Sequence, residues 1–119
     1  MKDYKLGVME TKFACLIWDN IPIPSGELVK LCEKKFDWKK STTYTMLRRL
    51  CDRGIFQNVD GVVSALLCQQ EFKALQSEQF IHETFDGSFP KFLAAFTTRT
   101  KLTENEISTL QKLIDGSRG

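Results

Sequence analysis

Long apolar segments are missing from this 119-residue sequence. No hydrophobic run approaches the roughly 20 residues that a helix needs to cross a bilayer. The first residues, MKDYKLGVMETK, also lack the apolar centre and the small-residue cleavage site of a secretory signal. We therefore expect a soluble cytoplasmic protein of one or two small units, with 42% hydrophobic residues to build its core.

Closely spaced cysteines and clustered histidines are absent as well. The four cysteines, Cys15, Cys32, Cys51 and Cys68, never form the Cys-x-x-Cys spacing that chelates zinc or iron. Three of them fall at apolar-periodic positions, so we expect buried thiols that act as small hydrophobes rather than ligands or disulfides. No nucleophile and base can be grouped with the single histidine, His82. We expect no enzyme activity, no metal and no cofactor.

Positive charge is concentrated in one segment, although the formal net charge of the chain is only +2. Between Lys34 and Arg53 there are seven basic residues and two acidic ones, a local balance of +5, which leaves −3 for the rest of the chain. Such asymmetry is typical of a nucleic-acid-binding element. A solvated basic helix face has the same charge pattern and is the alternative.

Hydrophobic spacing predicts three helices in the first half of the chain. Apolar residues recur every three or four positions over residues 6–20, until IPIP ends this helix. Ser25 is expected to cap a second helix over residues 25–36. A third helix is expected over residues 40–53, closed by Gly54, which tolerates the left-handed conformation after a helix.

A β-hairpin is predicted over residues 55–67, because IFQNV and VVSALL flank the dipeptide Asp60-Gly61, which suits a type I′ turn. Three helices followed by a hairpin predict a winged helix-turn-helix DNA-binding domain over residues 1–69. The hairpin has no lysine or arginine near its turn. Its role is therefore expected to be limited to packing and a few polar contacts from Gln57 and Asn58.

The rest of the chain, residues 70–119, is predicted to be a helical dimerisation domain, so the fold is mainly α with a small β-hairpin. One helix is expected over residues 71–85, a second capped by Ser88, and a third announced by the capping box TENE at residues 103–106. The apolar residues exceed what about 50 residues can hide, so we expect two copies to interlock rather than the tail to fold back on the N-terminal domain. The expected dimer contacts are Phe72, Phe80, Ile81, Phe85, Phe92, Leu93, Phe96, Ile107, Leu110 and Ile114.

The segment KKSTTYTMLRRLCDRG places hydroxyls and cations on one side of the third helix and an apolar stripe on the other. At 100° per residue, Thr43, Met46, Leu47 and Leu50 share one inward arc. Hydroxyl and aromatic groups read base edges in the major groove of DNA, and cations hold phosphates. The residues expected to contact DNA are Lys39, Lys40, Ser41, Thr42, Tyr44, Thr45, Arg48 and Arg49. The alternative is that these are ordinary capping and surface residues of a solvated helix.

These residues resemble the penicillinase-repressor (BlaI/MecI/CopY) family of bacterial winged-helix transcriptional regulators. The stretch FDWKKSTTYTMLRRLCDRG is similar to the family pattern DWSPKTVxTLLxRLxKKG, and LIWDN closes the first helix in the family's manner. The likeness continues through FIHETFDGSFPKFLAAFTTRTKLTENEISTLQKLI. The matching positions are Asp37, Trp38, Thr42, Thr45, Leu47, Arg49, Leu50 and Gly54, followed in the tail by Phe80, Gly87, Phe96, Leu102 and Glu106.

The resemblance implies a homodimeric repressor that occupies an inverted-repeat operator, occludes polymerase and is released on an inducing signal. In the penicillinase branch, a membrane sensor for β-lactam leads to cleavage of the repressor tail, and the family's cleavage site aligns with Ala95-Phe96. Lys39-Lys40-Ser41 replaces the family's Ser-Pro-Lys, so the operator sequence does not transfer. The C-terminal cysteine cluster of the copper branch is missing, which argues against copper sensing.

Two further interpretations stay open at this point. The uncharged wing is compatible with a winged-helix protein-interaction module that does not bind DNA sequence-specifically. The scattered cysteines are compatible with a thiol- or metal-responsive regulator.

Overall fold

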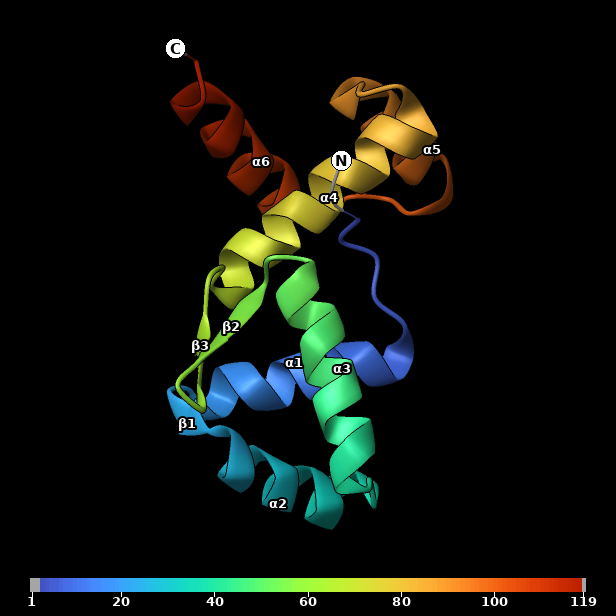
Figure 1. Ribbon diagram of the computed structural model, residues 1–119. Helices are drawn as coiled ribbons and strands as arrows, with labels where there is room; N and C mark the ends of the chain where they lie inside the picture. Colours follow the sequence, from blue (N-terminus) through green and yellow to red (C-terminus); the bar gives the residue numbers. More distant parts are fainter. Residues whose placement is uncertain (1–2, 119) are drawn as a thin grey trace. The chain divides into compact units, whose positions relative to one another are not determined.

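The computed structural model describes residues 3–118, which fold as two compact units (Figure 1). The first unit extends to Gln79 and the second begins at Phe80. The predicted class, a winged helix followed by a helical tail, is confirmed. The expected division of labour at residue 69, with DNA binding before it and dimerisation after it, is a functional division and stays a prediction.

Nine elements make up the described chain. In order they are α1 (Val8–Asn20), β1 (Ile23–Pro24), α2 (Ser25–Phe36), α3 (Lys40–Asp52), β2 (Phe56–Val59), β3 (Val62–Ala65), α4 (Gln69–Phe85), α5 (Phe89–Arg99) and α6 (Glu104–Gly116). The predicted helices and hairpin are all present, and their bounds differ from the predicted ones by one or two residues. Leu6 is one such difference, since it precedes α1 and packs against the core instead of belonging to the helix.

The core of the first unit forms where α1, α2 and α3 meet the sheet. Its buried apolar side chains are Phe13, Ala14, Leu16, Ile17, Ile23, Leu28, Cys32, Leu47, Leu50, Ile55, Phe56, Val63 and Phe72. Burial of this set removes a large apolar area from water, which is the main driving force for folding. The core therefore holds α3 by its inner side only, and leaves its outer side to solvent.

The second helix begins differently from the prediction. Ser25 was expected as its N-cap, but Pro24 holds that position and Ser25 is the first helical residue. The Ser25 side chain is instead 3.1 Å from the Tyr44 hydroxyl of α3, within hydrogen-bond distance. Strand β1 ends at Pro24 and α2 begins at the next residue, so Pro24 is the last extended residue and takes the N-cap position.

The sheet has three strands, in the order β1-β3-β2, where a two-stranded hairpin was expected. The β2–β3 hairpin turns at Asp60 and Gly61, which both have positive φ values (51° and 77°), as the dipeptide predicted. β1 was read only as a helix stop. Proline is tolerated there because β1 is an edge strand, where an N–H need not be paired. The Ser25 N–H also donates to the Gly61 carbonyl at 2.8 Å, which ties the tip of the wing to α2.

In the second unit, both predicted helix caps are confirmed. The Ser88 side chain accepts from the Lys91 N–H at 3.2 Å at the start of α5. At the start of α6, the Thr103 hydroxyl accepts from the Glu106 N–H at 3.1 Å, and the Glu106 carboxylate accepts from the Thr103 N–H at 2.8 Å. Two backbone donors that the helix leaves unpaired are thereby satisfied at this end.

Candidate nucleic-acid interface

Helix α3 has a buried side and a solvent side, as its sequence predicted. Thr43, Leu47 and Leu50 are buried, and Met46 is half-buried against the core. No acidic residue lies in the first turn, and Gly54, with a φ of 77°, follows the helix. The helix is thus anchored by one apolar stripe, and the residues opposite this stripe face solvent.

The residues expected to contact DNA lie together on the solvent side. The exposed members of this set are Lys39, Lys40, Ser41, Thr42, Thr45, Arg48 and Arg49. Arg49 donates to the Met46 sulfur at 3.7 Å, a weak contact, and in residues 3–118 no acidic side chain forms an ion pair with Arg48. These guanidinium groups thus remain available to phosphate or to base acceptors.

Tyr44 is placed differently from its neighbours in the predicted set. It is half-buried, and its hydroxyl is 3.1 Å from the Ser25 side chain. The Lys40 Nζ lies 6.0 Å from the centroid of the Tyr44 ring, at the outer limit of a cation–π contact. The side chain therefore holds α2 and α3 together, and its contact with DNA stays a prediction.

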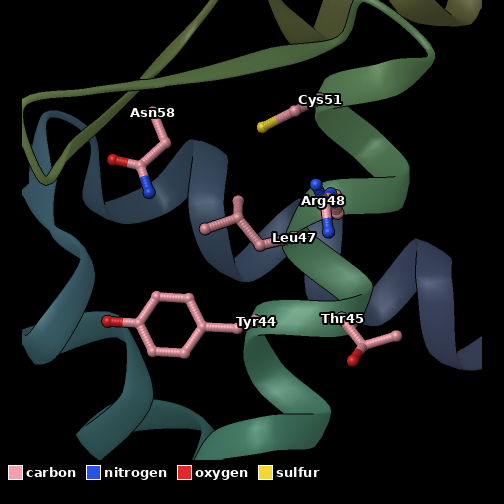
Figure 2. Close-up of a pocket in the computed structure, with 6 residues that line it drawn as sticks. All are labelled: Tyr44, Thr45, Leu47, Arg48, Cys51 and Asn58. Carbon is pink, nitrogen blue, oxygen red and sulfur yellow. The ribbon is translucent and has the colours of Figure 1, made fainter.

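A hollow of about 480 Å³ lies between α3 and the wing. Its lining residues are Tyr44, Thr45, Leu47, Arg48, Cys51 and Asn58. Figure 2 shows Asn58 and Cys51 reaching toward the same space from β2 and α3. Asn58 was expected to supply a polar contact from the wing, and the structure places it on the wall of the hollow opposite α3, which contributes Thr45 and Arg48. That grouping was not predicted, because the packing of β2 against α3 is a tertiary contact.

The thiol in this hollow is not activated. Burial is the largest cause that raises the pKa of the Cys51 thiol, and the nearby Asp52 carboxylate raises it further. Such a thiol stays protonated and is a poor nucleophile at neutral pH. The chemistry of the hollow is therefore hydrogen bonding and apolar contact rather than covalent reaction.

One cation of the basic segment is directed elsewhere. Arg53 was counted in the expected electrostatic footprint, but its Nη1 donates to the Lys5 carbonyl at 2.6 Å. Its Nη2 also lies 3.8 Å from a Glu10 carboxylate oxygen. The solvent side of α3 and its N-terminal end therefore carry four cations, Lys39, Lys40, Arg48 and Arg49.

The four cysteines are free thiols with different exposure. Cys32 is fully buried, as expected for a small hydrophobe, while Cys15 and Cys51 are only half-buried. Cys68 is exposed, and its sulfur accepts from the Glu71 N–H at 3.4 Å at the start of α4. Over residues 3–118, no three His, Cys, Asp or Glu side chains are grouped so as to hold a metal ion.

The residues expected at a dimer contact are placed in two environments. Phe72 is only 3% exposed and packs against Tyr4 and Trp18 in the first unit, so it belongs to that core. This corrects its assignment to the dimer contact, which followed from helical periodicity in the tail alone. The other nine lie in the second unit, where Phe80, Phe96, Ile107 and Ile114 are exposed and Ile81, Phe85, Phe92, Leu93 and Leu110 are half-buried.

Ala95 and Phe96, the pair that aligns with the family's cleavage site, lie inside α5 and are exposed. The Ala95 carbonyl accepts from the Thr98 hydroxyl at 2.7 Å.

As for hydropathy, none of the helices within residues 3–118 combines the length and apolar character that spanning a membrane requires.

The chain is similar to known regulatory proteins along almost its whole length. The penicillinase repressor family matches residues 6–116. The methicillin resistance regulatory protein MecI of Staphylococcus aureus (strain Mu50 / ATCC 700699) is 23% identical over 118 residues, which cover 96% of each chain. MecI of Mammaliicoccus sciuri is 22% identical with the same coverage. The penicillinase repressor of Bacillus licheniformis is 24% identical over 119 residues, covering 97% of this chain and 89% of that protein.

These relatives are repressors and regulatory proteins rather than enzymes, which confirms the expectation that the chain is not an enzyme. The match extends from two residues before α1 through the end of α6, so it includes both the winged helix and the helical tail. The chain belongs to the penicillinase repressor family.

Proposed function

We propose that this protein is a DNA-binding transcriptional repressor that acts as a homodimer on an inverted-repeat operator. The observation that carries the proposal is the solvent side of α3, where hydroxyls and cations are exposed together while the opposite side is packed in the core. A helix of this kind fits the major groove, where side chains reach base edges and phosphates line the rim. Membership in a family of repressors supports the same function.

The roles on α3 divide by chemistry. Thr42 and Thr45 supply hydroxyl and methyl groups, which suit base edges and thymine methyls. Lys39 and Lys40 lie at the N-terminal end of the helix, where the helix dipole and free N–H groups favour phosphate. Arg48 and Asn58 line the same hollow, from α3 and from the wing, and both side chains can donate hydrogen bonds to the duplex.

The test uses a duplex that the full chain selects from a random library. Thr45→Ala is expected to weaken binding to that duplex by about 1–3 kcal/mol per half-site and to leave random DNA unaffected. Lys40→Ala is expected to weaken both, and to reduce the salt dependence by about one phosphate contact. Equal losses on selected and random DNA for Thr45→Ala would remove the base-reading role of α3.

Dimerisation is supported by what the second unit leaves exposed. None of its side chains in residues 80–118 is buried, and Phe89, Phe96, Ile107, Leu113 and Ile114 are 44–63% exposed. A unit of about 40 residues without a closed core is not stable alone, so a second copy is the natural cover. Ile107→Asp is expected to give monomers in sedimentation velocity, while Ser108→Asp, the same change on the neighbouring exposed residue, is expected to keep the dimer. Dimers with both variants would exclude α6 from the contact.

Release of the operator is proposed to follow an inducing signal, with β-lactam-linked proteolysis between Ala95 and Phe96 as the specific route. Both residues are exposed but helical, and a protease requires an extended backbone, so α5 must unwind locally for cleavage. Mass spectrometry of the protein from β-lactam-treated host cells is expected to show a fragment ending at Ala95. Derepression with only intact protein present would refute this route and leave the DNA-binding role unaffected.

One observation favours a second function, a winged-helix protein-interaction module. The wing tip presents Val59 and Val62, which are 54% and 41% exposed, and no cation lies between them. Counterion release makes phosphate binding steeply salt-dependent, so affinity for DNA is expected to fall steeply between 50 and 200 mM salt if the repressor proposal is right. Weak binding that is unchanged by salt would favour the interaction module.

A further inference from the structure

Residues 3–7 form a strap, without helix or strand structure, that the DNA and dimer contacts do not explain (Figure 1, dark blue). Helix α4 pairs both backbone groups of Tyr4. The Tyr4 N–H donates to the Gln79 side-chain oxygen at 2.8 Å, and the Gln76 amide donates to the Tyr4 carbonyl at 2.9 Å. The Gln79 amide also donates to the Asp3 carboxylate at 3.1 Å. Because residues 3–7 are neither helix nor strand, the backbone of Tyr4 depends on these side chains of α4 for its hydrogen bonds.

The other end of the strap is bound to the end of α3. Arg53, which follows the last residue of α3, donates to the Lys5 carbonyl at 2.6 Å and lies 3.8 Å from Glu10 of α1. The Tyr4 ring meets the Phe72 ring edge-on, with centroids 6.0 Å apart. The strap therefore connects the end of α3 to α4, through an exposed hydrogen bond at Lys5 and two part-buried hydrogen bonds at Tyr4.

Beyond Phe72, α4 is not anchored in the core of the first unit. Residues 73–79 include no buried side chain, and α4 is the segment through which the chain passes into the second unit. A helix fixed only at Phe72 can pivot there, whereas bonds from Gln76 and Gln79 fix it two further turns along. The direction in which α4 leaves the winged helix therefore depends on the strap.

We propose that Gln76 and Gln79, with Arg53 at the opposite end of the strap, are positioning residues that set the half-site spacing which the dimer accepts. This rests on the proposed function, because only a dimer on an inverted repeat reads spacing. Each base pair added between half-sites turns one of them by about 35° around the duplex, so a fixed α4 selects one spacer length. If α4 can pivot, the dimer accepts several spacer lengths.

The experiment is a selection by the full chain from inverted repeats with random half-sites and spacers of different lengths. Wild-type protein is expected to enrich one half-site and one spacer length. The Gln76→Ala/Gln79→Ala variant is expected to enrich the same half-site, with other spacers rising by about fivefold for each hydrogen bond removed. Gln70→Ala is the matched control, since the Gln70 side chain is exposed on the same helix and makes no hydrogen bond within residues 3–118; this variant is expected to keep the single spacer.

The outcomes separate this inference from the proposed function. A wild-type selection with no recurring half-site refutes the repressor proposal. Two outcomes refute the role of the strap in spacing and leave the repressor proposal intact. One is a recurring half-site with unchanged spacers in the double variant. The other is a recurring half-site with no spacer preference in the wild type. If the double variant does not fold, Gln79→Ala, which keeps the Gln76 bond, is used in the same selection and is judged by the same criteria.

Discussion

Phe72 offers the sharpest test of how the molecule is divided, because its sequence pattern and its structural environment point to different roles. The ring is 3% exposed, with centroids 6.0 Å from Tyr4 and 5.4 Å from Trp18. Replacing a buried phenylalanine by alanine costs about 3–5 kcal/mol through lost burial and the cavity that remains. We expect Phe72→Ala to lower the free energy of unfolding of the first unit by about 4 kcal/mol.

Urea denaturation followed by tryptophan fluorescence measures this loss. Both tryptophans, Trp18 and Trp38, pack in the first unit, so the signal reports its unfolding. With a slope of about 1.5 kcal/mol per molar urea, the midpoint is expected to fall by about 2–3 M. Phe96→Ala is the control, since this ring is 44% exposed and lies in the second unit. It is expected to weaken dimerisation and to move the fluorescence midpoint much less.

The opposite result would refute the reasoning. A change below about 1 kcal/mol for Phe72→Ala, combined with loss of the dimer in sedimentation, would place the ring at the contact between copies, as its helical spacing first suggested. Sedimentation at several protein concentrations separates the two cases, because a core defect leaves the association constant of the folded protein largely unchanged.

Four other predictions follow from the first unit. Native protein treated with a thiol reagent is expected to react first at exposed Cys68 and last at buried Cys32; simultaneous reaction would contradict the burial order. Burial raises the pKa of the Cys32 thiol, so its stabilising contribution is complete below the usual value of 9.0 and is lost as pH rises through the folded pKa; thermal melts of Cys32→Ala are expected to show a weaker fall in this alkaline range. Gly61→Ala is expected to cost about 1–2 kcal/mol in urea denaturation, since φ is 77° with open space around the missing Cβ, and Gly61→Asn less. Tyr44→Phe is expected to cost about 1 kcal/mol by removing the bond to Ser25, and equal stability of the two proteins would show that bond to be unimportant.

Local patterns were sufficient for the helices and the hairpin. The apolar stripe of α3, the positive-φ pair at the wing and the capping box at Thr103 each depend on neighbours within a few residues, and each is confirmed. The exposed side of α3 follows from the same periodicity. A helix buried along one stripe must turn its remaining residues to solvent.

Contacts between distant residues were decided only by the tertiary structure. β1 needed β3 to become a strand, and Pro24 in its sequence favoured a simple break. Phe72 has the spacing of a tail helix, and only its approach to Trp18 shows that it belongs to the core. Arg53 has the charge of a DNA contact, but the Lys5 carbonyl takes its guanidinium.

The sequence by itself thus determined the helices, the hairpin, the outward face of α3 and the family. The tertiary structure decided which apolar and charged side chains are used within the chain and which stay exposed. The physical reason is that helical and strand periodicity report which side of an element is apolar, whereas partner choice depends on pairs separated by some 40 to 75 positions, such as Lys5 with Arg53 or Tyr4 with Gln79.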